Sequence, residues 1–308
     1  MSENSSENNI EENTISSQTE NPPSNSEIPS QTENQPSDSE ISAQTENSQK
    51  IHTLKVNSLY KSFGRKKVVQ GVDFQMHTGE VLGLLGPNGA GKTTVFNMLS
   101  GIYKPTSGTI TFVGRDENLQ VVSGKSPAQL NRIGIARTFQ NIRLFGHLTA
   151  AENIKIALHQ TRTVTPIDVL LRTKKFRDDE KIMQEKTELL LSIFHLDSKK
   201  NELAHNLPYG EQRKLEICRA LASSPKLLLL DEPAAGMNGQ ETEELMELIS
   251  FIRKKFNLTV LLIEHDMKLV MGICERLMVL NYGRVIASGL PAEIQSNSAV
   301  IKAYLGSE

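Results

Sequence analysis

Residues 86–94 read GPNGAGKTT and complete the spacing GxxxxGK[ST]. Gly86, Gly89 and Gly91 let the backbone turn tightly, so that consecutive N–H groups converge on a concavity that fits phosphate oxygens. Lys92 would reach the β- and γ-phosphates of a bound nucleotide. A glycine-rich turn with a solvated lysine is the alternative interpretation, and the flanking sequence decides between the two.

The motif has the flanks that a nucleotide site requires. Residues 80–85 (EVLGLL) predict a short apolar strand before it, and residues 93–99 (TTVFNML) predict a helix after it. The N-terminus of that helix would point its partial positive charge at the phosphates. Thr93 would then ligate Mg²⁺, and the Thr94 hydroxyl would lie near the α-phosphate. The other predicted nucleotide contacts in the loop are Pro87, Asn88, Gly89, Ala90 and Gly91.

Two acidic residues follow a strand that contains four consecutive leucines. Residues 226–233 read KLLLLDEP, which predicts a central parallel strand that is buried on both faces. Asp231 and Glu232 stand at its carboxyl end, where ligands gather in open α/β sheets. There Asp231 can hold Mg²⁺ through water, and Glu232 can accept a proton from an attacking water. Such residues are otherwise solvated or capping groups, but the phosphate loop favours the functional interpretation.

A histidine and a glutamine are further candidates. Residues 258–266 (LTVLLIEHD) predict another buried strand, which ends in His265. A histidine at a strand end is usually structural, but His265 would share a sheet edge with Asp231 and could donate to a γ-phosphate. Gln140 ends the stretch RIGIARTFQ. A glutamine there could be an ordinary polar loop residue, so its role depends on the wider pattern of motifs.

An aromatic residue could stack on the nucleotide base. Phe63 lies 23 residues before Gly86, at the end of a predicted strand. Aromatic residues at strand ends are more often simply packed against neighbours, and Tyr60 competes for the role.

A second helix terminus could bind an anion. Residues 206–225 begin NLPYGEQ, with Pro208 at the opening of a predicted helix. Proline is tolerated there because the N–H groups of the first turn have no intrahelical acceptor. The free N–H groups of Tyr209 and Gly210 would suit a phosphate.

The remaining segments predict the elements that position these groups. Strands are expected at residues 51–63, 67–69, 72–76 and 109–114, helices at 242–256 and 291–305, and a hairpin around 281–283. Residues 150–205 combine helical periodicity with many charges and have no β-rich run. They predict a helical subdomain inserted into an α/β core.

The first 50 residues differ in composition from the rest. They are rich in Ser, Asn, Glu, Gln and Pro, and repeat QTEN with a period of 13. They hold ten acidic side chains and one basic one, so the remainder carries 33 Lys and Arg against 26 Asp and Glu. We expect a disordered acidic tail. The surplus of +7 elsewhere forms no basic block, so no nucleic-acid partner is expected.

Cysteine use and hydropathy indicate a cytosolic chain. Cys218 and Cys274 are the only two cysteines and form no CxxC or Cys/His cluster, so neither a disulfide framework nor a zinc site is expected. No apolar run reaches the roughly 18–20 residues of a spanning helix, and the N-terminus lacks the features of a signal peptide. A membrane role would come through a partner.

Taken together, these motifs resemble the ATP-binding-cassette (ABC) ATPases over residues 53–306. The Walker A motif corresponds to residues 86–94, the Q-loop to Gln140, the signature to residues 207–211, Walker B to residues 227–231 with Glu232, the D-loop to residues 235–238, and the switch histidine to His265. The stretches RTFQNIRLF, NLPYGEQRKLEICRAL, LLDEPAAGMN and LLIEHDMKLVMGIC are similar to the LivG type, the ATPases of branched-chain amino-acid importers. Pro208 and Asn238 depart from the general pattern, which has serine and aspartate there.

The resemblance implies an α/β P-loop NTPase core with an antiparallel β subdomain and a helical subdomain at about residues 141–224, all within residues 51–308. It implies ATP and Mg²⁺ as ligands, with Thr93, Gln140 and Asp231 at the metal. In the implied head-to-tail dimer, the catalytic side of one subunit faces Tyr209, Gly210 and Glu211 of the other. Lys92, Gln140, Glu232 and His265 are the implied catalytic residues.

The implied partners are integral-membrane permease subunits and a second ATPase, either a LivF-like companion or another copy. A periplasmic or surface substrate-binding protein would act indirectly, and the chain would lie peripherally on the cytoplasmic face of the membrane. A urea or amide importer, or a lipopolysaccharide exporter, is the alternative for the cargo. Soluble cassette proteins of ribosomes or DNA repair are disfavoured, because the chain has one cassette and an insertion of only about 60 residues.

Overall fold

A six-stranded sheet carries the catalytic motifs. The computed structural model describes residues 52–159 and 165–305, and the predicted N-terminal tail lies outside them. The strand order is β10-β9-β3-β8-β7-β6, and all neighbours are parallel except β9 and β10. The strands are β3 (Val81–Leu85), β6 (Ile135–Arg137), β7 (Leu227–Asp231), β8 (Thr259–Ile263), β9 (Arg276–Asn281) and β10 (Arg284–Gly289).

The leucine run of β7 is buried on both faces, as its composition predicts. Leu227 and Leu229 pack into the core that includes helix α2 (Lys92–Leu99), whereas Leu228 and Leu230 pack into the core on the opposite face. This alternation is that of a strand whose successive side chains point to opposite faces. A strand buried on both sides needs a continuous apolar run, which explains the four leucines.

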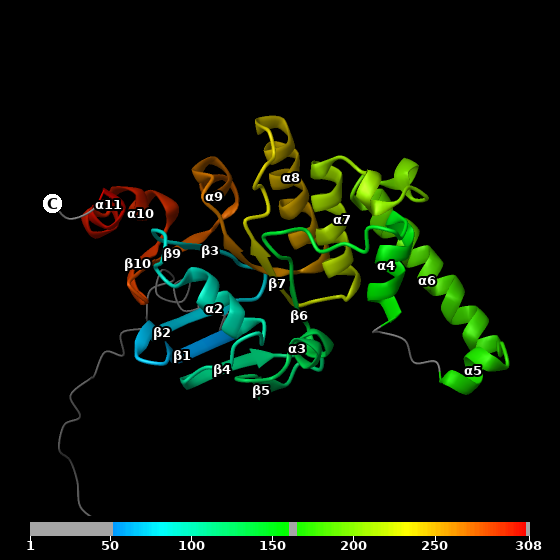
Figure 1. The fold of residues 1–308 in the computed structure, drawn as a ribbon, viewed down its shortest axis with the longest axis horizontal. Helices are drawn as coiled ribbons and strands as arrows, with labels where there is room; N and C mark the ends of the chain where they lie inside the picture. Colours follow the sequence, from blue (N-terminus) through cyan, green and yellow to red (C-terminus); the bar gives the residue numbers. More distant parts are fainter. Residues whose placement is uncertain (1–51, 160–164, 306–308) are drawn as a thin grey trace, which may run out of the picture. The chain divides into compact units, whose positions relative to one another are not determined.

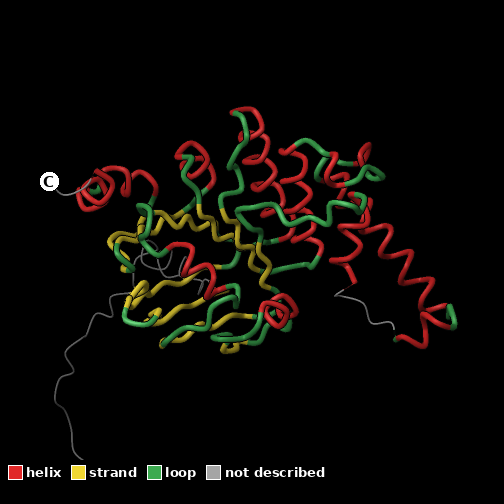
Figure 2. Tube along the Cα trace, viewed as in Figure 1, coloured by secondary structure: helices red, strands yellow, loops and turns green. Residues whose placement is uncertain are grey.

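A four-stranded antiparallel sheet covers the other side of α2, in the order β2-β1-β4-β5. Figure 1 shows α2 between the two sheets, and Figure 2 shows strands on both sides of this helix. The strands are β1 (His52–Phe63), β2 (Lys66–His77), β4 (Ser107–Val113) and β5 (Leu119–Val121). The prediction of two strands at residues 67–69 and 72–76 is wrong. Gly71, with φ of 75°, is a bulge within the single strand β2.

Helices cover the far face of the six-stranded sheet (Figure 1). These are α7 (Tyr209–Ala222), α8 (Gly239–Phe256) and α9 (Met267–Ile273). The Asn238 side chain accepts a hydrogen bond from the Glu241 N–H and so begins α8 at Gly239, three residues before the predicted start. Helix α9 and helix α3 (Pro127–Ile133) were not predicted.

The predicted helical subdomain is present between β6 and β7. It contains α4 (Ala150–Leu158), α5 (Pro166–Leu170) and α6 (Lys174–Ile193), with 3₁₀ turns at Asp197–Lys199 and Ala204–Asn206. Leu190 and Phe194 are buried, so the apolar stripe of this segment is core, as predicted.

The C-terminal segment forms two helices where one was predicted. These are α10 (Pro291–Ser296) and α11 (Ser298–Leu305). Asn297 separates them with an extended ψ of 118°, and its side-chain oxygen accepts hydrogen bonds from the N–H groups of Ala299 and Val300. An asparagine that caps a new helix ends the preceding one.

Candidate active site

The phosphate loop has the backbone that its glycines predict. Gly86, Gly89 and Gly91 have φ values of 143°, 79° and 104°, in the region that glycine tolerates best. A Cβ on Gly86 would lie 2.1 Å from the Leu280 carbonyl oxygen. Gly91 is the residue before α2, whose N-terminus opens at the loop. The loop conformation and the helix terminus therefore occur together at one place, as an anion site requires.

Lys92 lies folded against the loop. Its Nζ donates to the carbonyl oxygens of Gly86 and Pro87, at 2.6 and 3.2 Å. Burial lowers the pKa of Lys92, while the carboxylates of Glu232 and Asp231 oppose this by raising it. The two acidic residues that the sequence singled out therefore act electrostatically on this ammonium.

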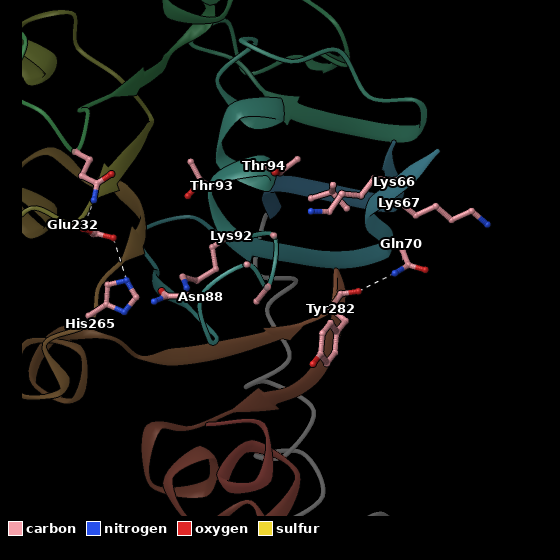
Figure 3. A pocket seen from close by; sticks show the side chains of 15 residues that line it. Lys66, Lys67, Gln70, Asn88, Lys92, Thr93, Thr94, Glu232, His265 and Tyr282 are labelled. Carbon is pink, nitrogen blue, oxygen red and sulfur yellow. Dashed lines mark hydrogen bonds and ion pairs between the residues drawn. The ribbon is translucent and has the colours of Figure 1, made fainter. Parts of the chain in front are cut away.

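A cleft of about 470 Å³ opens at the loop, within the range of roughly 300–1,000 Å³ typical of small-molecule sites. Figure 3 shows Glu232 and His265 on one side of it and Lys66 and Lys67 on the other, with Lys92 between them. The lining residues are Lys66, Lys67, Val68, Gln70, Asn88, Gly89, Ala90, Gly91, Lys92, Thr93, Thr94, Gln140, Glu232, His265 and Tyr282.

Glu232 is held between two side chains that the sequence also predicted. Gln140 donates from Nε2 to one carboxylate oxygen at 2.8 Å, and His265 Nε2 lies 3.1 Å from the other. Glu232 has a φ of 48°, a rare value for a residue other than glycine. Its N–H donates to the Ile263 carbonyl at the end of β8. Three strand-end residues from distant parts of the sequence therefore meet in one cluster.

Asp231 has a partner that sequence reasoning missed. Arg137, the last residue of β6, contacts Asp231 Oδ2 through Nη2 at 2.7 Å, and both side chains are buried. The other terminal nitrogen of Arg137 donates to Asn97, which lies within α2, and to Ser100, which follows it. Burial lowers the pKa of Arg137, and the Asp231 hydrogen bond opposes that shift. The feature that could have identified Arg137 from the sequence is its position three residues before Gln140.

Arg213 was also missed, although it secures the Gln140 loop. Its guanidinium is fully buried and donates to the carbonyl oxygens of Phe139 and Gln140, each at 2.7 Å. It also pairs with Glu216 at 2.9 Å. Two charged residues three apart on a helix usually indicate a solvated face, and here they form a buried link between α7 and the loop.

The other predicted contacts lie away from this cleft. Pro208 precedes α7, and no side chain caps its first turn, which leaves the N–H groups of Tyr209, Gly210 and Glu211 at a helix terminus. Phe63 is 43% exposed, packs edge-on against Tyr103 at 5.2 Å between ring centres, and is absent from the residues that line the cleft. The nucleotide roles of Phe63 and the signature residues stay predictions.

The chain matches two protein-family patterns. That of the family described as ABC transporter covers residues 69–235, and that described as branched-chain amino acid ATP-binding cassette transporter covers residues 284–308. The first match includes the phosphate loop, Gln140 and both carboxylates. The second includes α10 and α11.

Relatives of known function match along most of their length. The high-affinity branched-chain amino acid transport ATP-binding protein LivG of Escherichia coli (strain K12) is 47% identical over 253 residues, covering 82% of this chain and 97% of the relative. Its counterpart BraF of Pseudomonas aeruginosa is 44% identical over 253 residues, with the same coverage of 82% and 97%. The lipopolysaccharide export system ATP-binding protein LptB of Acidithiobacillus ferridurans is 37% identical over 255 residues, covering 83% and 97%.

Solved structures share the fold. The ADP conformation of an ATP-binding cassette of an ABC transporter superposes with a TM-score of 0.71 at 30% identity, covering 83% of this chain and all (100%) of the other. A nucleotide-free cassette gives 0.71 at 29% identity, with the same coverage of 83% and 100%. Among the residues that the structure describes, no helix is both long and apolar enough to cross a membrane.

Proposed function

The chain belongs to the ABC transporter family of ATP-binding proteins, and we propose that it is the ATP-hydrolysing subunit of a membrane importer for branched-chain amino acids. The observation that carries the proposal is the Glu232 carboxylate, which lies between Gln140 and His265 at the cleft that opens on the phosphate loop.

Hydrolysis follows from the placement of these groups. The loop N–H groups and the α2 terminus would hold the phosphates, and Lys92 would offset the charge that develops on the transferred phosphoryl group. Glu232 would accept the proton of the attacking water. Gln140 and His265 fix the orientation of that carboxylate, since each contacts a different oxygen. A base that is held in the right orientation lowers the activation barrier, because less orientational freedom is lost in the transition state.

The residues beside the cleft fit a magnesium ion. Mg²⁺ prefers oxygen ligands, and Thr93 and Gln140 both line the cleft. The amide nitrogen of Gln140 is engaged by Glu232, which directs the amide oxygen away from that carboxylate. Asp231, held by Arg137 through one oxygen, would complete the set through water. A bound ion would neutralise charge on the phosphate oxygens.

Dimer formation would bring the α7 terminus of one subunit to the ATP of the other. The uncapped N–H groups of Tyr209, Gly210 and Glu211 support this, because they can receive a γ-phosphate without the serine hydroxyl that Pro208 replaces. Asn238, the other departure from the general motif, serves as the cap of α8. The dimer partner is a LivF-like companion or a second copy, and we favour the companion.

Permease subunits would contact the groove beside the Gln140 loop. This groove is lined in part by Phe145, Ile156 and Arg219, and Phe145 is 49% exposed. Ala136 and Arg137 of β6 also line this groove, and β6 ends three residues before Gln140. A permease contact in the groove could therefore shift Gln140 and, through it, Glu232. The subunit would sit peripherally on the cytoplasmic face, and a substrate-binding protein would act through the permease.

Uptake in cells tests the cargo. Cells whose only copy carries Glu232→Gln should lose uptake of labelled leucine, isoleucine and valine while urea uptake continues. Unchanged uptake of all three amino acids, with the variant stably present, would assign the subunit to another cargo, such as the lipopolysaccharide suggested by the 37% identical relative.

A further inference from the structure

The C-terminal helix α11 reaches the first residue of the phosphate loop. The backbone N–H of Gly86 donates a hydrogen bond to the Tyr304 hydroxyl, with 2.9 Å between nitrogen and oxygen. Gly86 directly follows β3, whose last residue, Leu85, pairs with β9. Its N–H therefore lies beyond the strand ladder, and a backbone donor in a partly buried position needs a partner. Tyr304 supplies that partner across 218 residues of sequence.

Gly86 is also the residue on which the loop lysine rests. Its carbonyl oxygen accepts a hydrogen bond from Lys92 Nζ at 2.6 Å. On a third side, the Leu280 carbonyl oxygen would lie 2.1 Å from any Cβ at this position. Because the N–H and the carbonyl belong to the same residue, a shift of Gly86 at one contact moves the other. Tyr304 thus acts on the anchor of the phosphate-binding ammonium.

The other end of the loop is held by the same C-terminal part of the chain. The N–H of Gly283, in the turn between β9 and β10, donates to the Ala90 carbonyl oxygen at 2.9 Å. Residues 276–305 therefore bracket the loop, at Ala90 through the turn and at Gly86 through α11. Two contacts on opposite ends of a glycine-rich loop restrict a backbone that glycine would otherwise leave free.

The Tyr304 side chain is suited to this contact rather than to core packing. It is 49% exposed, so removal of its hydroxyl leaves no cavity in the core. Burial of the phenol raises the pKa of Tyr304, and the Gly86 hydrogen bond opposes the rise. The phenol is neutral at ordinary pH, and its oxygen accepts from Gly86 through a lone pair.

We propose that Tyr304 is a positioning residue of the phosphate loop, and that α11 strengthens the binding of the phosphates of ATP by holding Gly86. This assigns a role to the C-terminal segment matched at residues 284–308. This inference rests on the proposed binding of ATP at the phosphate loop. ATP binding by the wild-type protein tests that site, whereas the difference between wild type and a Tyr304 variant tests the positioning role.

The test compares full-length Tyr304→Phe with wild type. The variant keeps the ring and loses the acceptor, so the Kd for ATP should rise about 3–10-fold, the scale of one lost hydrogen bond. KM should rise with it, and kcat should stay within roughly twofold because Glu232 and its partners are untouched. Hydrogen exchange of the Gly86 amide should accelerate at least tenfold, while exchange within α2 is unchanged.

Leu305→Ala is the matched control. Leu305 follows Tyr304 on the same helix and is 81% exposed, so its truncation should leave Kd, kcat and Gly86 exchange at wild-type values. Unchanged exchange at Gly86 in Tyr304→Phe would refute the contact. Faster exchange with an unchanged Kd would refute the positioning role, as would a loss of kcat at constant KM. A wild-type protein that binds no ATP would instead refute the nucleotide site itself.

Discussion

Arg213→Met removes the guanidinium that joins α7 to the Gln140 loop. Arg213 is the largest of the fully buried side chains in the described part of the chain. Its loss leaves two loop carbonyls without this donor and leaves Glu216 buried without its ion-pair partner. Methionine is similar in length and apolar, so the main change is in polar contacts rather than in volume.

The expected cost follows from those contacts. Breaking a buried ion pair by removing one partner costs about 3–5 kcal/mol of unfolding free energy, and the orphaned carbonyls act in the same direction. For a domain of this size, that corresponds to a fall in Tm of roughly 6–20 °C. The Gln140 loop should also exchange its amide hydrogens faster, because its backbone acceptors are no longer held.

The pH dependence of the lost unfolding free energy shows whether the unpaired Glu216 carboxylate causes it. Burial raises the pKa of Glu216, and Arg213 counteracts this rise. A carboxyl whose pKa is higher in the folded than in the unfolded state destabilises the fold increasingly as the pH rises from the unfolded pKa to the folded pKa. Without Arg213 the pKa rises further, so the deficit should be larger at about pH 8 than at about pH 5.

Thermal and urea unfolding of Arg213→Met provide the assay. Lys268→Met, which breaks an exposed pair with Glu243, is the control and should cost less than about 1 kcal/mol. If Arg213→Met lost no more unfolding free energy than Lys268→Met, or if its loss did not depend on pH, the reasoning would be refuted.

Three further changes probe the loop, a helix cap and the thiols. Gly86→Ala places a methyl group 2.1 Å from a backbone carbonyl oxygen of β9 and should weaken ATP binding at least ~10-fold. Gly239→Ala, which has open space at its Cβ, is the control and should not weaken it. Equal affinities of the two variants for ATP in an equilibrium binding assay would contradict this prediction. Asn238→Ala should lower the free energy of unfolding by about 1 kcal/mol in urea titration, while Asn238→Asp retains the cap of α8; equal losses would show that the cap contributes nothing. Burial raises the pKa of Cys274 to about 12 and also raises that of Cys218, so neither thiol should react with a thiol reagent at about pH 8 before unfolding; rapid labelling of the native protein would oppose this.

The conformation of the phosphate loop could be predicted because it depends on local spacing. The phosphate loop is a continuous segment, and its glycine conformations follow from residue type. Asp231, Glu232 and His265 could be placed because parallel strands bring their carboxyl ends to one edge of the sheet. The structure confirms that Gln140, Glu232 and His265 meet.

The missed residues depend on tertiary contacts that spacing does not encode. Arg137 ends a short strand and Arg213 lies in the first turns of α7, and only the fold buries them beside Asp231 and the Gln140 loop. Tyr304 reaches Gly86 across 218 residues. Short elements such as β5 and α9 offered too few residues to show a period. The bulge at Gly71 was misread as a strand break, because a glycine at positive φ is compatible with both.

Glu232 is the proposed base of ATP hydrolysis. Glu232→Gln keeps the size of the side chain and an oxygen that can accept from Gln140, but it removes the carboxylate that takes up a proton. Steady-state hydrolysis of the purified variant should fall about 10²–10⁴-fold, while its affinity for ATP stays within roughly threefold of wild type. Near-wild-type turnover by that variant would contradict the account.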